Sequence, residues 1–398
     1  MADASARAAE VLARCRARVA NDPALAMRLA PIDGFSALRD AIVAECAASG
    51  GPDDAAALSG VDLSQVRPAM APAQWPECAR RGWQPFALEW DAGGAELLWG
   101  CGETDASAPF HESTLAALRT RPFNRCLALR MPLAPARVDD LERSALPLAG
   151  LVLHESRCGS TLVAQSLKAW PGTRVVGEPA LLDTALFAAL AGHDPGWLLF
   201  RGTLAALCQP AGDDVRVIVK LDAWHALALG TLRARMPAVP WLFVYRDPLE
   251  VLVSHAREPG RHTVPGMLPE TWLPPLAPGD VTSPVAHAAR VLGALCTAVA
   301  AHAGAANLVD YDELVAHGNG APPPALARDI PRHFGLDPDD ADPARLAPAL
   351  ARDTKRPGER FEDDRASKRA AATEAVRAAA DRWIAPHHAA LQAIRQGR

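Results

Sequence analysis

The sequence contains no apolar run near the roughly 20 residues that a membrane-spanning helix requires. Its first residues lack the basic and apolar regions of a secretory signal. Neither sign of charge dominates the 398 residues, since 41 basic and 46 acidic side chains give a formal net charge of -5. A nucleic-acid-binding protein usually carries an excess of basic residues, and this chain has no such excess. We therefore expect a cytoplasmic protein without membrane or nucleic-acid partners.

The eight cysteines include no pair spaced as C-x-x-C, the spacing that is typical of many metal sites. A chain of this length also needs no disulfide scaffold to stabilise its core. We therefore expect no metal site of the C-x-x-C type, and we expect most of the thiols to be reduced and buried.

Three segments of the chain differ in composition. Residues 1–65 place apolar residues at helical spacing and predict a helical segment. Residues 66–140 contain four of the ten tryptophans and two strand-like stretches around an Asp-Ala-Gly-Gly turn, which predicts a small α+β unit. In residues 145–398, apolar strands alternate with helical stretches long enough for right-handed crossovers. This pattern predicts an α/β domain with a doubly wound parallel sheet and ligands at the carboxyl ends of its strands.

Residues 151–163 are the most informative stretch. They read as a buried strand, a tight turn and a helix that begins with two hydroxyl residues. N–H groups at a helix N-terminus bind anions, Gly159 permits close approach, and Arg157 carries a permanent positive charge. The pattern predicts a phosphate-binding loop, and an ordinary strand-to-helix turn is the alternative. The predicted contacts come from Arg157, Cys158, Gly159, Ser160 and Thr161.

The corresponding loop of nucleotide triphosphatases spaces two glycines across four residues and places a Lys before the Ser or Thr, whereas here Gly159 precedes Ser160 directly and the Lys is missing. A phosphoryl-transfer enzyme uses that Lys together with an acidic magnesium ligand. A nucleotide kinase or hydrolase is therefore a disfavoured alternative. The motif Arg-x-Gly-Ser-Thr instead resembles the 5'-phosphosulfate loop of the sulfotransferases that use 3'-phosphoadenosine 5'-phosphosulfate (PAPS) as donor.

A second motif supports the resemblance. An apolar strand at 241–245 is followed by Arg246, Pro248 and Ser254, which is the family's spacing Arg-x-Pro-x-x-x-x-x-Ser. In the family this motif holds the 3'-phosphate of the donor, and a forked guanidinium with a hydroxyl can share one phosphate. The alternative is a helix start with a surface ion pair.

Two further residues match reacting groups of the family. Glu178 follows a short β-rich run and resembles the general base of protein-tyrosine sulfotransferases and some bacterial relatives. Lys220 ends the strand 215–220 and resembles the Lys that contacts the donor's bridging oxygen. Together with Arg157 it would offset the charge that builds on the leaving phosphate. The alternatives are a Glu stabilised by a helix dipole and a strand-terminal Lys exposed to water.

Three segments after residue 250 complete the comparison with the family. Tyr311 begins a Tyr-Asp-Glu-Leu segment that resembles the family's Tyr-Glu-Asp-Leu, which lies near the donor. Lys355 and Arg356 belong to a basic tail, and in several sulfotransferases such a tail completes the 3'-phosphate site. A solvated charge run is the alternative for these two residues. The Pro-rich stretch 257–280 would be either a lid over the acceptor or a surface excursion without a role.

The resemblance covers roughly residues 148–390 and implies transfer of a sulfuryl group from PAPS to a hydroxyl or amine, without a metal. The acceptor would be a small molecule, a carbohydrate or a peptide, and its class and the oligomeric state stay open. The segment from Asn21 onward also resembles a leader-peptide domain family first named for nitrogen-fixation gene clusters, and a plain helical hairpin is the alternative. A non-catalytic nucleotide- or peptide-binding protein is the remaining functional alternative.

Overall fold

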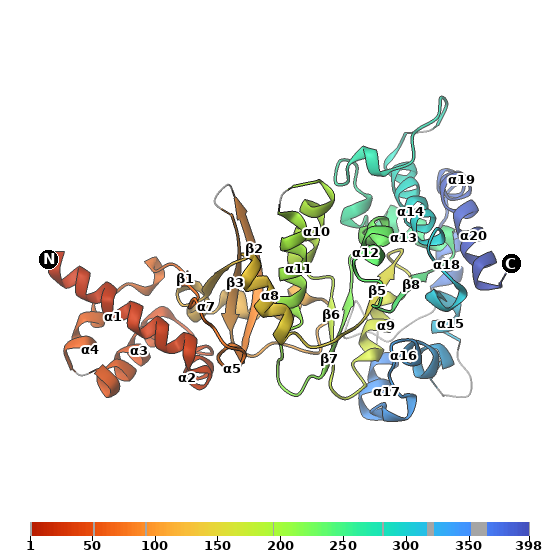
Figure 1. Ribbon diagram of the computed structural model, residues 1–398. Helices are drawn as coiled ribbons and strands as arrows, with labels where there is room; N and C mark the ends of the chain where they lie inside the picture. The colour runs from red at the N-terminus through yellow and green to blue at the C-terminus, as the bar shows by residue number, and fades with distance from the viewer. Residues whose placement is uncertain are drawn as a thin grey trace. The chain divides into compact units, whose positions relative to one another are not determined.

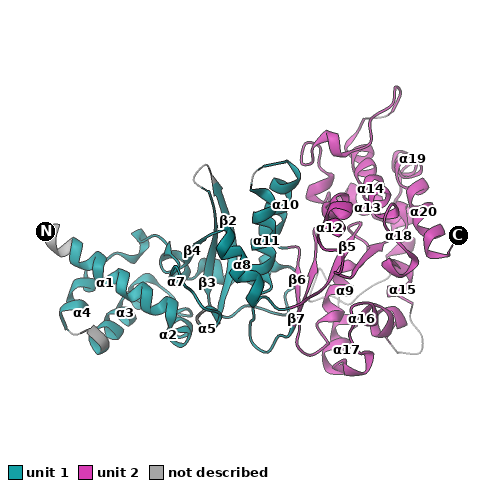
Figure 2. Cartoon of the chain, viewed as in Figure 1, with its two compact units in different colours: residues 1–146, 179–215 teal, residues 147–178, 216–398 magenta. Residues whose placement is uncertain are grey.

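The computed structural model describes residues 2–50, 52–91, 94–193, 195–280, 282–316, 322–351 and 364–397. The chain forms two compact units, which Figure 2 colours separately. Unit 1 contains Met1–Leu146 and Pro179–Val215, and unit 2 contains Pro147–Glu178 and Arg216–Arg398. Residues 179–215 thus group with the N-terminal part of the chain, although the sequence analysis places them within its third segment.

Unit 1 begins with helices, in agreement with the spacing of its apolar residues. Helix α2 starts where Asp22 accepts a hydrogen bond from the Leu25 N–H at 3.0 Å, and Pro23 occupies the first helical position. Val11 and Val19 of the preceding helix are buried on one face. The helices of this segment are α1 (Ala2–Asn21), α2 (Pro23–Leu29), α3 (Phe35–Gly50) and α4 (Pro52–Ser59).

A four-stranded sheet follows in unit 1, with the strand order β1-β4-β3-β2. Its tryptophans form a core, because Trp75 packs edge-to-face against both Trp83 and Trp99 with ring centroids 5.5 Å apart. The strands are β1 (Ala69–Met70), β2 (Trp83–Asp91), β3 (Gly94–Cys101) and β4 (Leu129–Pro132). The other helices of unit 1 are α5 (Glu77–Arg80), α6 (His111–Thr120), α7 (Pro122–Cys126), α8 (Pro135–Ser144), α10 (Ala180–Leu190) and α11 (Gly196–Leu207).

Unit 2 is built on a five-stranded sheet in which every pairing is parallel, so the predicted α/β class and parallel sheet are confirmed (Figure 1). The strand order is β6-β7-β5-β8-β9. Strand β5 lies between β7 and β8, so the chain proceeds from it in both directions across the sheet. Ligands of open parallel sheets bind at such a point, outside the strands' carboxyl ends. The strands are β5 (Leu148–His154), β6 (Thr173–Gly177), β7 (Arg216–Lys220), β8 (Trp241–Tyr245) and β9 (Leu308–Asp310).

The central strands of unit 2 are buried because apolar side chains occupy consecutive positions, as expected for a parallel sheet covered on both faces. Val152, Ile218 and Val244 belong to one core cluster with Trp170. The helices of unit 2 are α9 (Ser160–Leu167), α12 (Leu229–Arg235), α13 (Pro248–Arg257), α14 (Pro284–Ala300), α15 (Tyr311–Leu314), α16 (Ile330–His333), α17 (Pro343–Ala351), α18 (Arg365–Ala370), α19 (Glu374–Trp383) and α20 (Ala385–Arg395).

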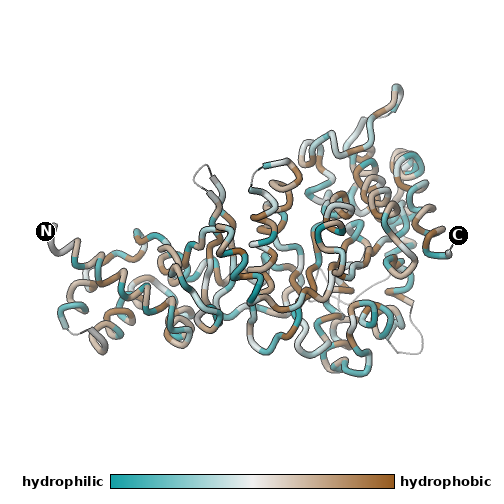
Figure 3. The backbone as a smooth tube through the Cα atoms, in the orientation of Figure 1, coloured by the Kyte–Doolittle hydropathy of each residue, from teal (hydrophilic) through white to brown (hydrophobic). Residues whose placement is uncertain are grey.

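Hydropathy along the chain is mixed in both units, and the helices in Figure 3 carry hydrophilic as well as hydrophobic residues. Within the described ranges, no helix combines the length and the apolar character needed to cross a membrane.

The Pro-rich stretch 257–280 packs onto unit 2. Trp272 stacks on Trp224 with ring centroids 5.7 Å apart. The buried Arg290 of α14 forms an ion pair with Glu270 at 2.8 Å and donates to the Pro274 carbonyl at 2.6 Å. These contacts hold the stretch against the body of unit 2 in this structure.

Candidate functional site

The loop between β5 and α9 has an unusual backbone. Ser156 and Arg157 have φ values of 76° and 53°, and Gly159 has φ 88°. A non-glycine residue in this left-handed region costs about 1–3 kcal/mol, and such residues cluster at functional sites. Among the described residues, the third non-glycine residue with a positive φ is Glu178, at the end of β6. The strained positions therefore coincide with two of the turns that the sequence analysis selects.

Gly159 is required for two reasons. Its left-handed backbone disfavours other residues, and a Cβ atom there would lie 2.9 Å from Cδ2 of Tyr311. Helix α9 begins directly after it with Ser160 and Thr161, whose side chains are nearly buried. The loop thus leads into a helix N-terminus, which attracts anions through its N–H groups and dipole.

The Cys158 side chain belongs to the hydrophobic core of unit 2. Its side chain is fully buried, and Sγ donates to the Val244 carbonyl at 3.0 Å. Burial raises the pKa of this thiol to about 12, so it stays protonated and non-nucleophilic near neutral pH. Any ligand contact of Cys158 would therefore come from its backbone.

Glu178 and Lys220 lie together at the ends of neighbouring parallel strands. The Glu178 N–H donates to the Lys220 carbonyl at 2.7 Å, which continues the pairing of β6 with β7. The Lys220 ammonium also contacts Oε1 of Glu178. Lys220 is completely buried and is therefore not a strand-terminal lysine exposed to water, whereas the Glu178 side chain is 25% exposed. The carboxylate is thus the part of this pair that solvent reaches.

The surroundings keep Glu178 ionised. Burial by itself would raise the pKa of this carboxyl, but the Lys220 charge and the hydrogen bonds of His154 and Lys220 hold the pKa well below its usual range. His154 Nδ1 accepts the Ser156 N–H at 3.0 Å, so the neutral ring carries its proton on Nε2, which lies 3.0 Å from the Leu221 carbonyl oxygen and 3.3 Å from Glu178 Oε1. Burial lowers the pKa of His154, which favours this neutral form.

Arg157 extends from the loop to the beginning of the Pro-rich stretch. Its Nη1 lies 3.0 Å from Oε2 of Glu258, and its Nη2 donates to the Glu258 carbonyl at 3.0 Å. The Arg157 side chain is 17% exposed and that of Glu258 is 78% exposed. The guanidinium predicted to bind phosphate is thus held by an exposed carboxylate.

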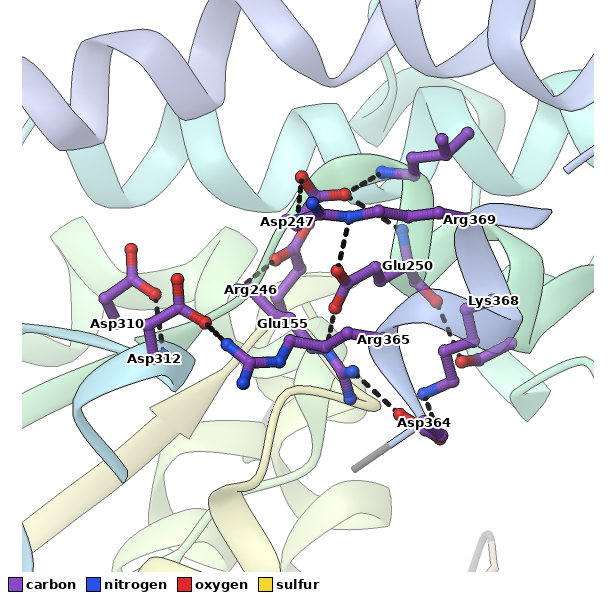
Figure 4. A network of polar contacts seen from close by, with 12 residues as sticks. Glu155, Arg246, Asp247, Glu250, Asp310, Asp312, Asp364, Arg365, Lys368 and Arg369 are labelled. Atoms are coloured by element: carbon purple, nitrogen blue, oxygen red, sulfur yellow. Dashed lines mark hydrogen bonds and ion pairs between the residues drawn. The ribbon is translucent and has the colours of Figure 1, made fainter. Parts of the chain in front are cut away.

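Arg246 follows β8 and is 4% exposed. Its Nε donates to Glu250 Oε2 at 2.7 Å, and its Nη2 donates to Asp364 Oδ1 at 2.8 Å (Figure 4). The guanidinium carbon lies 3.9 Å from the ring centroid of Tyr311, a cation–π contact. The alternative of an exposed surface ion pair therefore does not describe Arg246.

The two arginine-bearing turns belong to one site. They follow β5 and β8, which are neighbouring strands. The Arg246 N–H donates to Oε2 of Glu155 at 3.2 Å, and Glu155 immediately follows β5. Tyr311 contacts both turns, because its ring packs under Gly159 and under the Arg246 guanidinium. The structure therefore brings Tyr311, Arg246 and the loop between β5 and α9 together, as the sequence analysis requires.

Ser254 lies two turns into α13, and its hydroxyl donates to the Glu250 carbonyl at 2.9 Å. The helix itself starts with Pro248, and Asp247 accepts hydrogen bonds from the N–H groups of Leu249 and Glu250. Ser254 is thus on the predicted helix, with its hydroxyl bonded to that helix in this structure. Lys355 and Arg356 lie outside the described residues.

Sequence reasoning missed His262. It lies in the Pro-rich stretch, is 7% exposed, and its Nε2 has no hydrogen-bond partner among the described residues. Burial lowers the pKa of His262 to about 4, and Asp222, His154, Glu178 and Arg157 interact with it electrostatically. A neutral imidazole beside these groups is suited to a hydrogen bond with a ligand. A single His in a Pro-rich segment carries no sequence signal for this placement.

Glu155 is the second residue that sequence reasoning missed. It is fully buried at the start of the loop between β5 and α9, and burial raises its pKa to about 8. The carboxyl is therefore mostly neutral near pH 7 and does not repel an anion in the loop. Its position directly after a buried strand was the available signal.

Replacing Glu155 with Gln is expected to change how stability depends on pH. The unfolded carboxyl releases its proton near pH 4.5 and the folded one near pH 8, so this group makes folding less favourable as pH rises between these values. The slope is up to about 1.4 kcal/mol per pH unit. Urea unfolding of both proteins from pH 5 to 8 should show a flatter profile for Glu155→Gln, and parallel profiles would contradict the assignment.

Among the described residues, no group of three or more His, Cys, Asp or Glu side chains is arranged to hold a metal ion. The candidate site therefore consists of the loop between β5 and α9, a paired carboxylate and ammonium, and a second buried arginine, all within unit 2. Comparison with known proteins finds no family model that matches this chain and no curated protein that matches it significantly.

Proposed function

We propose that this protein is a sulfotransferase that moves a sulfuryl group from PAPS to a hydroxyl or amine acceptor. The observation that carries the proposal is the contact between Glu178 and Lys220 at the ends of β6 and β7, within the same parallel sheet as the Arg157 loop. A base and a cation at one strand edge are suited to removing a proton and to stabilising a leaving anion. The fold would then be a doubly wound sheet of the P-loop type.

The donor would use both arginine-bearing turns. Its 5'-phosphosulfate would bind residues 157–161 through the N-terminus of α9 and the Arg157 guanidinium. Its 3'-phosphate would bind Arg246 and Ser254. Tyr311 supports this arrangement because its ring contacts the Arg246 guanidinium and packs under Gly159.

In the proposed reaction the acceptor oxygen or nitrogen attacks sulfur, and the bond between sulfur and the bridging phosphate oxygen breaks. Glu178 receives the acceptor proton, and 3'-phosphoadenosine 5'-phosphate (PAP) leaves with the bonding electrons. Lys220 and Arg157 offset the charge on the leaving phosphate. An ammonium has three N–H donors, so Lys220 can contact the carboxylate and the donor in the same complex. A shift of Lys220 towards the donor would weaken its contact with Glu178 and make that carboxylate a stronger base.

Thermal unfolding with three nucleotides tests the donor assignment. A ligand that binds only the folded state raises Tm. We expect PAP at about 100 times its Kd to stabilise the protein by roughly 2.7 kcal/mol, AMP to stabilise it less, and Mg-ATP to have little effect. A larger shift with Mg-ATP than with PAP would favour the kinase or hydrolase alternative and contradict the proposal. If the protein binds PAP but does not transfer the sulfuryl group of PAPS to any acceptor, it is a binding protein rather than an enzyme.

A further inference from the structure

Each arginine proposed to bind the donor forms an ion pair with a carboxylate that is far more exposed than the arginine itself. Glu258 is 78% exposed and Arg157 is 17% exposed. The Asp364 side chain is 48% exposed and that of Arg246 is 5% exposed. The two carboxylates come from different parts of unit 2, the Pro-rich stretch and the residue before α18, and they occupy the two positions where donor phosphates would bind.

Another carboxylate near Arg246 differs from these two. Glu250 is 1% exposed and binds both Arg246 Nε and Arg369 Nε, at 2.7 and 2.8 Å. Arg246 is itself buried, so loss of this carboxylate would leave its charge without a partner in the interior. Glu250 therefore fixes the position of Arg246, and Figure 4 shows the contacts of this carboxylate.

Asp364 is held differently. Arg246 Nη2 lies 2.8 Å from Oδ1, and Lys368 Nζ lies 2.8 Å from Oδ2. Two cations thus converge on a carboxylate that is half open to water (Figure 4). The Arg246 and Lys368 side chains are only 5% and 10% exposed, so this carboxylate can rotate into solvent readily only when another anion takes its place beside the two cations. A phosphate carries more charge and more acceptor oxygens, and it would bind the same two cations more strongly.

We propose that Glu258 and Asp364 are internal substitutes for the two anionic ends of the donor, and that donor binding displaces both. This inference rests on the proposed function. In the ligand-free protein the two carboxylates satisfy Arg157 and Arg246 and keep both guanidinium groups in place. They also lower the apparent affinity for the nucleotide, because the donor must first displace them.

The inference assigns each carboxylate to one end of the nucleotide, and this assignment is testable with PAP and AMP as probes. Calorimetric titration of the full chain should show that Asp364→Asn tightens PAP binding by about fivefold or more, because a pair with a buried partner is worth at least the upper value of about 1 kcal/mol found for exposed pairs. The same variant should leave AMP binding unchanged, because AMP has no 3'-phosphate. Glu258→Gln should tighten binding of both nucleotides by a similar factor.

Two matched variants control for general loss of negative charge. Asp329 is 54% exposed and pairs with Arg328 at 2.7 Å, and Glu270 is 63% exposed and pairs with Arg290 at 2.8 Å. Neither contacts Arg157 or Arg246 in the pairs described above. Asp329→Asn and Glu270→Gln are therefore expected to leave both dissociation constants unchanged.

The possible outcomes separate this inference from the proposed function. If the wild-type protein binds PAP but Asp364→Asn and Glu258→Gln bind it equally or more weakly, the carboxylates are structural partners and the inference is overturned. An equal gain for AMP and PAP in Asp364→Asn would overturn its assignment to the 3'-phosphate. If neither the wild-type protein nor any variant binds PAP, the proposed function fails and the inference fails with it.

Discussion

Replacement of Glu178 with Gln is expected to lower turnover by about 10²- to 10⁴-fold while PAP binding stays nearly unchanged. Gln keeps the size and hydrogen-bonding capacity of the side chain but cannot take a proton. The measurement is release of PAP from PAPS in the presence of a panel of phenol, sugar and amine acceptors, with the best acceptor used for both proteins. Unchanged turnover would remove Glu178 from the role of general base.

The acceptor's own acidity sharpens this test. A general base matters less when the acceptor loses its proton easily, so the defect of Glu178→Gln should shrink with an acidic phenol such as 4-nitrophenol. Glu142→Gln provides a matched control, because Glu142 pairs with Arg201 in unit 1, at 2.5 Å, outside the candidate site. An equal defect with weakly and strongly acidic phenols would point to loss of structure or of donor positioning.

Replacement of Arg246 with Ala is expected to weaken PAP binding by about 1.5–3 kcal/mol, the worth of a hydrogen bond to a charged group. AMP, which lacks the 3'-phosphate, should lose little. Both nucleotides are titrated into the same variant, so the difference between them cancels effects on folding. This matters because Arg246 is buried and pairs with the buried Glu250, and its loss also destabilises the protein.

The conservative variant Arg246→Lys separates charge from shape. Lys keeps the positive charge but cannot bind a phosphate and Glu250 through a planar fork. We expect the PAP affinity of Arg246→Lys to lie between that of the wild-type protein and that of Arg246→Ala. Equal losses for PAP and AMP in both variants would remove Arg246 from the 3'-phosphate site.

Local features of the site were predictable from sequence because short-range physics determines them. The alternation of apolar strands and helices predicted the parallel sheet, and Asp247 with Pro248 marked the start of α13. The turn at Gly159 needed a residue that tolerates positive φ, and the structure has φ 88° there. Because parallel strands direct their carboxyl ends to one edge of the sheet, the sequence also allowed us to predict that Glu178 and Lys220 lie at the same edge.

The partners of the two arginines were not predictable from sequence. Glu258 lies 101 residues from Arg157, and Asp364 lies 118 residues from Arg246. Exposed Glu and Asp residues are common in this chain, and nothing in their neighbourhoods marks these two. The position of His262 and the neutral state of Glu155 depend on burial, which packing of distant segments creates.

The amino-acid sequence alone therefore determined the elements that present the site: the strand ends, the glycine turn and the helix starts. These depend on residue spacing, backbone preference and hydrophobic periodicity over a few neighbouring residues. Only the tertiary structure decided which charges meet, which carboxyl stays protonated and which guanidinium groups already bind a carboxylate. Those properties depend on distances and desolvation between residues far apart in the chain, because electrostatic interactions and burial act through space rather than along the backbone.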